Sequence, residues 1–216
     1  MEGAKSFDAY EIVGILAPGV VVTLLLALEY PALKTLLGKD GLSVGDLGLF
    51  LVLAFVLGHL LQALGNLIEV AVWLFGGLPT NWVRSPKQKL VTVAQRQALQ
   101  AKVTAMEGDP AALETYKRAA WRAVTTRAYG FVCAAGRSIR IDNANRTYAL
   151  SRGLTAAFTV SLAWYALMHR DQWQTLAALG VMLLASIWRM RRGGVHYARA
   201  LILEFIDTPR ASATTP

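Results

Sequence analysis

Cysteine is almost absent from this chain of 216 residues, and charged side chains are scarce. The single thiol, Cys133, excludes an internal disulfide framework and any zinc site built from several thiolates, because both need more than one thiol. Only 17% of the residues are charged, whereas 55% are hydrophobic, which is unusual for a soluble globular domain. The composition therefore predicts a membrane protein whose charges lie at or beyond the ends of apolar spans.

Recognised catalytic motifs are also missing. The sequence has no Gly-rich phosphate loop, no His-Glu-x-x-His pair, no nucleophile elbow and no cluster of Cys and His. We therefore expect a protein that is not an enzyme and that binds neither a metal nor a cofactor.

Four apolar stretches approach the roughly 20 residues that a helix needs to cross about 30 Å of hydrocarbon. They cover residues 12–28, 47–78 (interrupted at Glu69), 153–168 and 172–188. Only three residues separate the last two stretches, which predicts a tight helical hairpin. The predicted fold is all-α, a four-span transmembrane helical bundle.

The basic residues orient these spans, because Lys and Arg are concentrated on the cytoplasmic side of membrane proteins. Residues 79–152 carry 13 Lys and Arg against four Asp and Glu, whereas the loop at 29–46 has a net charge of minus one. We expect membrane helices in residues 1–78, a basic helical cytoplasmic insertion in 79–152, a membrane hairpin in 153–188 and a cytoplasmic tail in 189–216. Both termini are then cytoplasmic.

Within the insertion, the Gly-Asp-Pro sequence at 108–110 predicts a break between two helices, one over about 87–106 and one from Pro110 onward. In the second helix, small apolar residues alternate with basic ones at helical spacing, which predicts an apolar face and a basic face. The residues of the expected apolar face are Ala112, Tyr116, Ala119 and Ala123.

Two further segments of this region are predicted from their composition. The polar segment 137–148 is expected to form a capped loop and a short helical run into the third span. After Gly193 and Gly194, residues 195–206 are expected to form a separate short helix.

The second span carries a polar stripe of four residues at offsets of three, seven and ten, which lie on one side of a helix. These residues are His59, Gln62, Asn66 and Glu69. Polar groups are costly in hydrocarbon, so an intramembrane stripe suggests a functional site such as the lining of a pore. The alternative is that the stripe only joins helices by hydrogen bonds, with Glu69 paired to a basic neighbour at the interface.

The first span contains Pro18 and Gly19, a pair that predicts a helix break or kink. A proline leaves one carbonyl without its helical partner, so that carbonyl needs a donor from elsewhere. The pair is either a flexible, gating element or a passive kink.

Eight basic residues of the cytoplasmic insertion are candidates for binding an anion or lipid headgroups. They are Lys117, Arg118, Arg122, Arg127, Arg137, Arg140, Arg146 and Arg152. Positive-inside topology already explains most of these residues, and headgroup contact is the simplest outcome for the last four, which lie just before the third span. Binding of a nucleotide or of a cytoplasmic protein is the more specific alternative.

These features support two hypotheses of function. The first is a homo-oligomeric gated pore or membrane-perturbing effector, in which the polar stripe of several subunits lines the path. The second is a non-conducting membrane scaffold that recruits a cytoplasmic partner through the amphipathic helices. A transporter or a membrane-embedded enzyme is a third possibility.

Three segments together resemble small, poorly characterised bacterial polytopic inner-membrane proteins, some of which accompany antiviral defence loci. The segments are FDAYEIVGILAPG (7–19), GHLLQALGNLIE (58–69) and NANRTYALSRGL (143–154). The resemblance implies an inner-membrane effector, or its partner, that compromises or monitors the membrane during infection. It transfers no catalytic residue.

Overall fold

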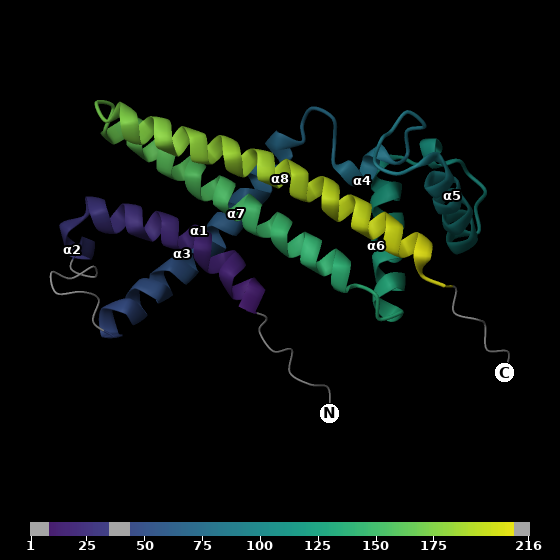
Figure 1. Ribbon diagram of the computed structural model, residues 1–216, viewed down its shortest axis with the longest axis horizontal. Coiled ribbons are helices and arrows are strands. Elements are labelled where there is room, and N and C mark those ends of the chain that lie inside the picture. Colours follow the sequence, from purple (N-terminus) through teal and green to yellow (C-terminus); the bar gives the residue numbers. More distant parts are fainter. Residues whose placement is uncertain (1–8, 35–43, 210–216) are drawn as a thin grey trace. The chain divides into compact units, whose positions relative to one another are not determined.

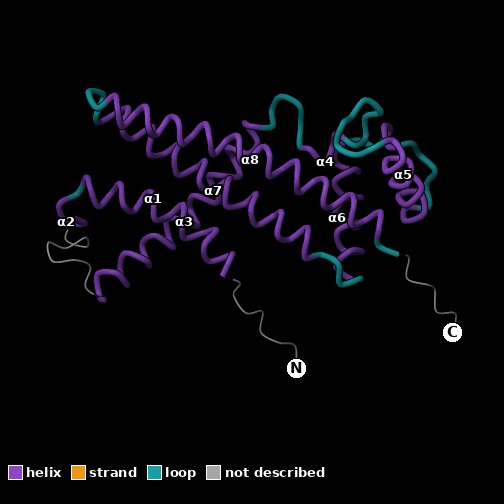
Figure 2. Tube along the Cα trace, viewed as in Figure 1, coloured by secondary structure: helices purple, strands orange, loops and turns teal. Residues whose placement is uncertain are grey.

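The computed structural model describes residues 9–34 and 44–209, and each regular element in these ranges is a helix (Figures 1 and 2). In chain order the elements are α1 (Ala9–Glu29), α2 (Pro31–Lys34), α3 (Val44–Val72), α4 (Pro79–Trp82), α5 (Val93–Glu107), the 3-10 turn η2 (Leu113–Thr115), α6 (Arg118–Ala134), α7 (Ile139–Met168) and α8 (Trp173–Asp207). The all-α prediction is confirmed for these residues. The two chain ends, for which a cytoplasmic location is predicted, lie outside the described residues.

The chain forms two compact units. The first unit combines the described residues up to Leu74 with Arg146–Arg191, and the second unit combines Phe75–Asn145 with the residues from Arg192 onward. Each unit therefore contains one part of α7 and one part of α8, and each is assembled from segments far apart in the sequence.

Two helices, both in the first unit, are long and apolar enough to cross a membrane. They are Ile12–Glu29 in α1 and the whole of α3, with mean hydropathies of 2.3 and 2.2. Only 28% and 22% of the residues in these apolar stretches are buried; exposed residues predominate in α3, whereas most of the unburied residues of α1 are half-buried. No other helix in the described ranges contains a stretch that is both as long and as apolar. In α7 and α8 the apolar stretch is shortened by Arg152 and Arg189, respectively.

The helices α1 and α3 pack with their backbones in direct contact (Figure 1). A Cβ atom at Gly19 would lie 1.7 Å from the carbonyl oxygen of Ala54, and one at Gly58 would lie 2.0 Å from that of Ile15. No side chain fits in such a space, so glycine is required at both positions. Close packing of this kind between small residues is how helices associate in membranes, where burial of apolar surface supplies no driving force.

The predicted hairpin between the third and fourth apolar stretches is confirmed. Only His169–Gln172 lie between α7 and α8, and the amide of Gln172 donates to the carbonyl of His169 within this turn. A connection of four residues is typical of antiparallel neighbouring helices.

Two boundaries in α7 and α8 differ from the predictions. The segment 137–148, expected to be a capped loop with a short helical run after it, is helical already from Ile139, because Ile141 and Ala144 pack into the core of the second unit. Likewise, α8 continues through Gly193 and Gly194 instead of restarting after them. Glycine costs a helix only about 1 kcal/mol, which the burial of apolar residues beyond it outweighs. The buried residues of this part of α8 are Ala198, Ala200, Leu201, Ile202 and Phe205.

In the second unit, the predicted break at 108–110 is confirmed, but both neighbouring helices are shorter than expected. The first, α5, begins at Val93 because Thr92 caps it: its hydroxyl accepts from the Gln95 amide while the Gln95 side chain accepts from the Thr92 amide. Gly108 ends α5 in a left-handed conformation, with φ of 72°. The next helix, α6, begins at Arg118 rather than at Pro110.

The apolar face of α6 also differs from the prediction. Ala119 and Ala123 are exposed, and the core instead receives four larger or more deeply placed residues. These are Trp121, Val124, Ala128 and Val132. Burial free energy grows with apolar area, so the face that carries Trp121 turns inward in preference to the alanine face.

Candidate functional site

The four residues of the polar stripe lie along α3 and fall into two pairs. Gln62 and Glu69 are half-buried on the side of α3 that packs in the first unit, whereas His59 and Asn66 are exposed. The members of each pair are seven residues apart, so each pair lies along one line of the helix. The stripe therefore follows the border between the packed and the exposed surface of α3.

Gln62 joins three helices. Its Nε2 donates to the carbonyl oxygen of Gly14 in α1 at 2.9 Å and, at 3.4 Å, to that of Ala149 in α7. Gly14 is four residues before Pro18, so its carbonyl is the one that the proline leaves without a helical donor. The prediction that this carbonyl needs another partner is confirmed, and Gln62 is the partner.

Glycine at position 153 makes room for this contact. A Cβ there would lie 2.6 Å from Nε2 of Gln62 and 2.8 Å from Cγ of Pro18. The helix α1 continues through Pro18 and Gly19 without interruption, and both residues are buried. Their expected role as a flexible element stays a prediction.

Glu69 takes part in a network at the end of α3. One carboxylate oxygen, Oε2, pairs with Nη1 of Arg152 at 2.7 Å, and the other, Oε1, accepts from the Tyr148 hydroxyl at 2.8 Å. The Tyr148 oxygen in turn accepts from Nε1 of Trp73 at 2.8 Å. Burial raises the pKa of the Tyr148 phenol, and the nearby Glu69 carboxylate raises it further. The phenol thus stays protonated, and able to donate to Glu69, up to a higher pH than an ordinary tyrosine.

The guanidinium of Arg191 lies over the Trp73 ring, 5.3 Å from its centroid, which extends this network to α8. Arg152, one of the predicted anion- or headgroup-binding residues, is thus paired with Glu69. The network links α3, α7 and α8 within the first unit.

A second polar contact joins the end of α1 to the turn after α7. Nε2 of His169, in this turn, lies at a hydrogen-bonding distance of 2.7 Å from Oε2 of Glu29, the last residue of α1. Beside this pair, the rings of Tyr30 and Trp164 approach to 6.2 Å between centroids. Sequence reasoning missed the pair, although both residues belong to loops predicted on the same side of the membrane.

The eight basic candidates differ in their surroundings. Four make ion pairs: Arg127 with Glu107, Arg137 and Arg140 with Glu204, and Arg152 with Glu69. Arg146 is half-buried on α7. The remaining three are exposed at the start of α6, and none of them forms an ion pair with a described residue. We call these three, Lys117, Arg118 and Arg122, the basic patch.

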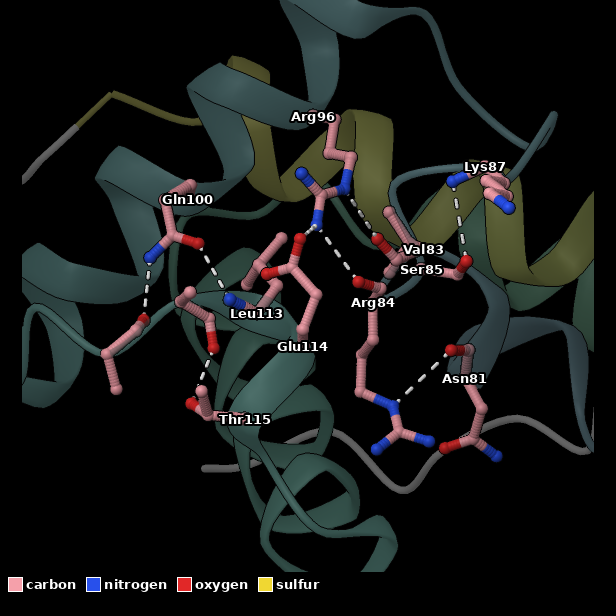
Figure 3. Close-up of polar contacts among 12 residues, drawn as sticks. Asn81, Val83, Arg84, Ser85, Lys87, Arg96, Gln100, Leu113, Glu114 and Thr115 are labelled. Carbon is pink, nitrogen blue, oxygen red and sulfur yellow. Dashed lines mark hydrogen bonds and ion pairs between the residues drawn. The ribbon is translucent and has the colours of Figure 1, made fainter.

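Another polar network, centred on Arg96, lies in the second unit (Figure 3). The Arg96 guanidinium donates to the carbonyls of Val83 and Arg84 at 3.1 and 2.9 Å and pairs with Glu114 at 2.6 Å. A hydrogen bond from the backbone, and then the Arg96 guanidinium, lower the pKa of the Glu114 carboxyl. Because its partners are backbone carbonyls and one carboxylate, the network holds two loops together rather than forming a reactive site.

In residues 9–34 and 44–209, no three His, Cys, Asp or Glu side chains are close enough to hold a metal ion. Comparisons of the chain with protein-family models, with curated proteins and with solved structures give no match. The function must therefore be argued from the geometry alone.

Proposed function

We propose that the chain is a multipass membrane protein whose first unit crosses the bilayer four times, through α1, α3 and the apolar parts of α7 and α8. The observation that carries this proposal is the position of two polar contacts. Glu29 meets His169, and Glu69 pairs with Arg152, so residues predicted on the same side of the membrane are in contact at each end. Between these ends the surfaces of α1 and α3 are apolar, and much of the α3 surface is exposed.

Aromatic residues on α8 support a fourth span. Trp173 and Trp188 are 68% and 63% exposed near the two ends of its apolar part. They are fifteen residues apart, which corresponds to about 22 Å along a helix. Tryptophan is enriched at both membrane interfaces, and this separation suits side chains that reach the two headgroup regions.

Within this membrane protein, the geometry favours a scaffold over a pore formed by one chain. Gln62 and Glu69 are satisfied by hydrogen bonds inside the first unit, so two of the four stripe residues are not available to line a path. We therefore propose a membrane scaffold whose second unit, on the cytoplasmic side, presents the basic patch to an acidic partner.

A pore formed by several copies is the second candidate. It is favoured by His59 and Asn66, which remain exposed on an otherwise apolar surface of α3. In a ring of subunits these two polar residues could face a central path.

Labelling of cysteines tests the topology. Cys133 is exposed in the second unit and is the only cysteine of the chain, so the unmodified protein carries its own reporter. A membrane-impermeant maleimide should label Cys133 in inverted membrane vesicles but not in intact cells. In a Cys133→Ser background, Asp171→Cys should give the reverse pattern. If Asp171→Cys is protected in intact cells, α7 and α8 do not span and the four-span proposal is wrong.

Charge reversal tests the scaffold. Cross-linking in membranes of cells that produce the protein should recover partner proteins bound to the second unit. The double variant Arg118→Glu/Arg122→Glu should no longer recover them. The matched control Lys87→Glu/Lys89→Glu makes the same change of charge at exposed residues of the same unit and should retain them. Purified protein in liposomes should conduct no ions. Ion flux that is lost in His59→Leu would overturn the scaffold and favour the pore.

A further inference from the structure

The outer surface of α3 carries a regular row of exposed residues with alternating spacings of four and three. The row consists of Val52, Val56, His59, Ala63, Asn66 and Val70. This spacing is the a and d pattern by which two parallel helices pack along a seam. All six residues are exposed in the folded chain, whereas the opposite side of α3, with Gly58 and Gly65, is buried. The helix thus has one packed face and one regular face without a partner.

Two members of this row are polar in the middle of an apolar helix. Neither His59 nor Asn66 makes a hydrogen bond to a described residue. The His59 ring packs edge-to-face against the ring of Phe55, with 4.6 Å between the two centroids. Between Asp46 and Glu69 the helix has no charged residue, so this face is surrounded by hydrocarbon if α3 spans the membrane. Polar side chains in that setting face another helix or water rather than lipid.

The chemistry of the row fits a second copy of itself. Asparagine, and imidazole in its neutral form, each carry both donors and acceptors, so identical side chains can bond to each other. The row contains no Asp, Glu, Lys or Arg, so no such charged group has to be neutralised when two copies meet. Ala63, between the two polar residues, is small enough to let two helices approach.

Membrane topology fixes how two copies meet. Copies inserted in the same orientation are related by a symmetry axis along the membrane normal, so their α3 helices run parallel. His59 then lies at the same depth as His59 of the second copy, and Asn66 at the same depth as Asn66. One register of the two helices therefore brings both pairs together. In coiled coils, too, a polar residue within the seam fixes the register.

We propose that this row, the α3 seam, is the surface through which two or more copies of the chain associate in the membrane, with His59 and Asn66 hydrogen-bonded between copies. This inference rests on the proposed membrane insertion of α3 and specifies how the scaffold assembles.

Oxidative cross-linking in membranes tests the seam. In a Cys133→Ser background, Val56→Cys and Ala63→Cys should form disulfide-linked dimers, because a disulfide needs Cα atoms within about 7 Å. Leu60→Cys and Leu67→Cys are the matched controls, each one helical turn after the corresponding test position. Leu60 and Leu67 are 63% and 69% exposed, but they lie beside the row and not in it. They should cross-link at least several-fold less.

A second variant tests the polar pair. Adding His59→Leu and Asn66→Leu to Ala63→Cys should reduce dimer formation at least about tenfold, since it removes two interhelical hydrogen bonds. Equal cross-linking at all four positions, or none at Val56 and Ala63, would overturn the proposed seam. Cross-linking only to a protein of different mass would overturn it as well. Extraction of the same membranes with alkaline carbonate separates the two proposals: a protein released by carbonate contradicts membrane insertion, whereas an inserted protein without seam cross-links contradicts this inference alone.

Discussion

The Gln62 side chain donates a hydrogen bond to the carbonyl of Gly14, the backbone group that Pro18 leaves without its helical donor. Replacement of Gln62 by Leu should leave this carbonyl unsatisfied and lower the free energy of unfolding by about 1–3 kcal/mol. Thermal unfolding in detergent micelles, followed by circular dichroism, measures the loss.

A double-mutant cycle isolates this relationship. Pro18→Ala restores an amide that can donate to Gly14, so Gln62→Leu should be less damaging in the Pro18→Ala background than alone. Equal losses in the two backgrounds would show that Gln62 stabilises the unit by another route.

The contact between α1 and α3 predicts that adding a methyl group at one glycine of α3 lowers stability strongly, whereas the same change at another glycine has little effect. Gly58→Ala places a Cβ 2.0 Å from the Ile15 carbonyl oxygen and should destabilise the first unit by about 1–3 kcal/mol or more through overpacking. Gly48→Ala is the matched control, because a Cβ there meets nothing within 4 Å, and it should be neutral or slightly stabilising. Similar melting temperatures for both variants would contradict the close approach of the two helices.

The two kinds of ion pair in the chain should differ in their contribution to stability. Glu69→Leu leaves Arg152 without its partner in a site where the two side chains are only 22% and 19% exposed. We expect a loss of about 2–3 kcal/mol, less than the 3–5 kcal/mol of a fully buried pair. Glu107→Leu removes the partner of Arg127, which is 53% exposed, and should cost less than about 1 kcal/mol. Chemical unfolding in detergent compares the two variants, and the reverse order would contradict this assignment.

The lowered pKa of Glu114 predicts a dependence of stability on acid. A carboxyl whose pKa is lower in the folded state adds stability that is fully present above its ordinary value of 4.5 and is lost as the pH falls through the lowered value. Glu114→Gln removes this contribution, so the melting temperature of the wild type should exceed that of the variant at neutral pH. The difference should shrink as the pH falls below 4.5. A difference that stays constant over this range would show that the ionised form is not what Arg96 stabilises.

Local patterns in the sequence predicted those parts of the structure that depend on nearest neighbours. The helical class, the hairpin around Arg170 and the break at Gly108 follow from hydropathy and from residues that end helices. The unpaired carbonyl created by Pro18 was also predictable, because it depends only on the i and i−4 positions of one helix.

Features that depend on distant segments were not predictable in this way. The donor to Gly14 lies 48 residues away, and nothing in its own neighbourhood indicates which of the four stripe residues turns inward. Helical spacing alone did not indicate the buried face of α6, because the face with Trp121 buries more apolar area than the face with Ala119 and Ala123. The continuation of α8 through Gly193 and Gly194 depends on buried residues that follow them, such as Phe205.

The division of the chain has a consequence for its synthesis on the ribosome. The core of the second unit contains Leu201, Ile202 and Phe205 from the end of α8, packed with residues from α5 and α6 made about a hundred residues earlier. A nascent chain grows from its N-terminus, so the apolar surface of these earlier segments stays exposed until the end of α8 has left the ribosome. Translation that stops before Phe205 therefore yields a product without part of the α8 contribution to this core. Such a product keeps apolar surface exposed and is a target for chaperones and proteases.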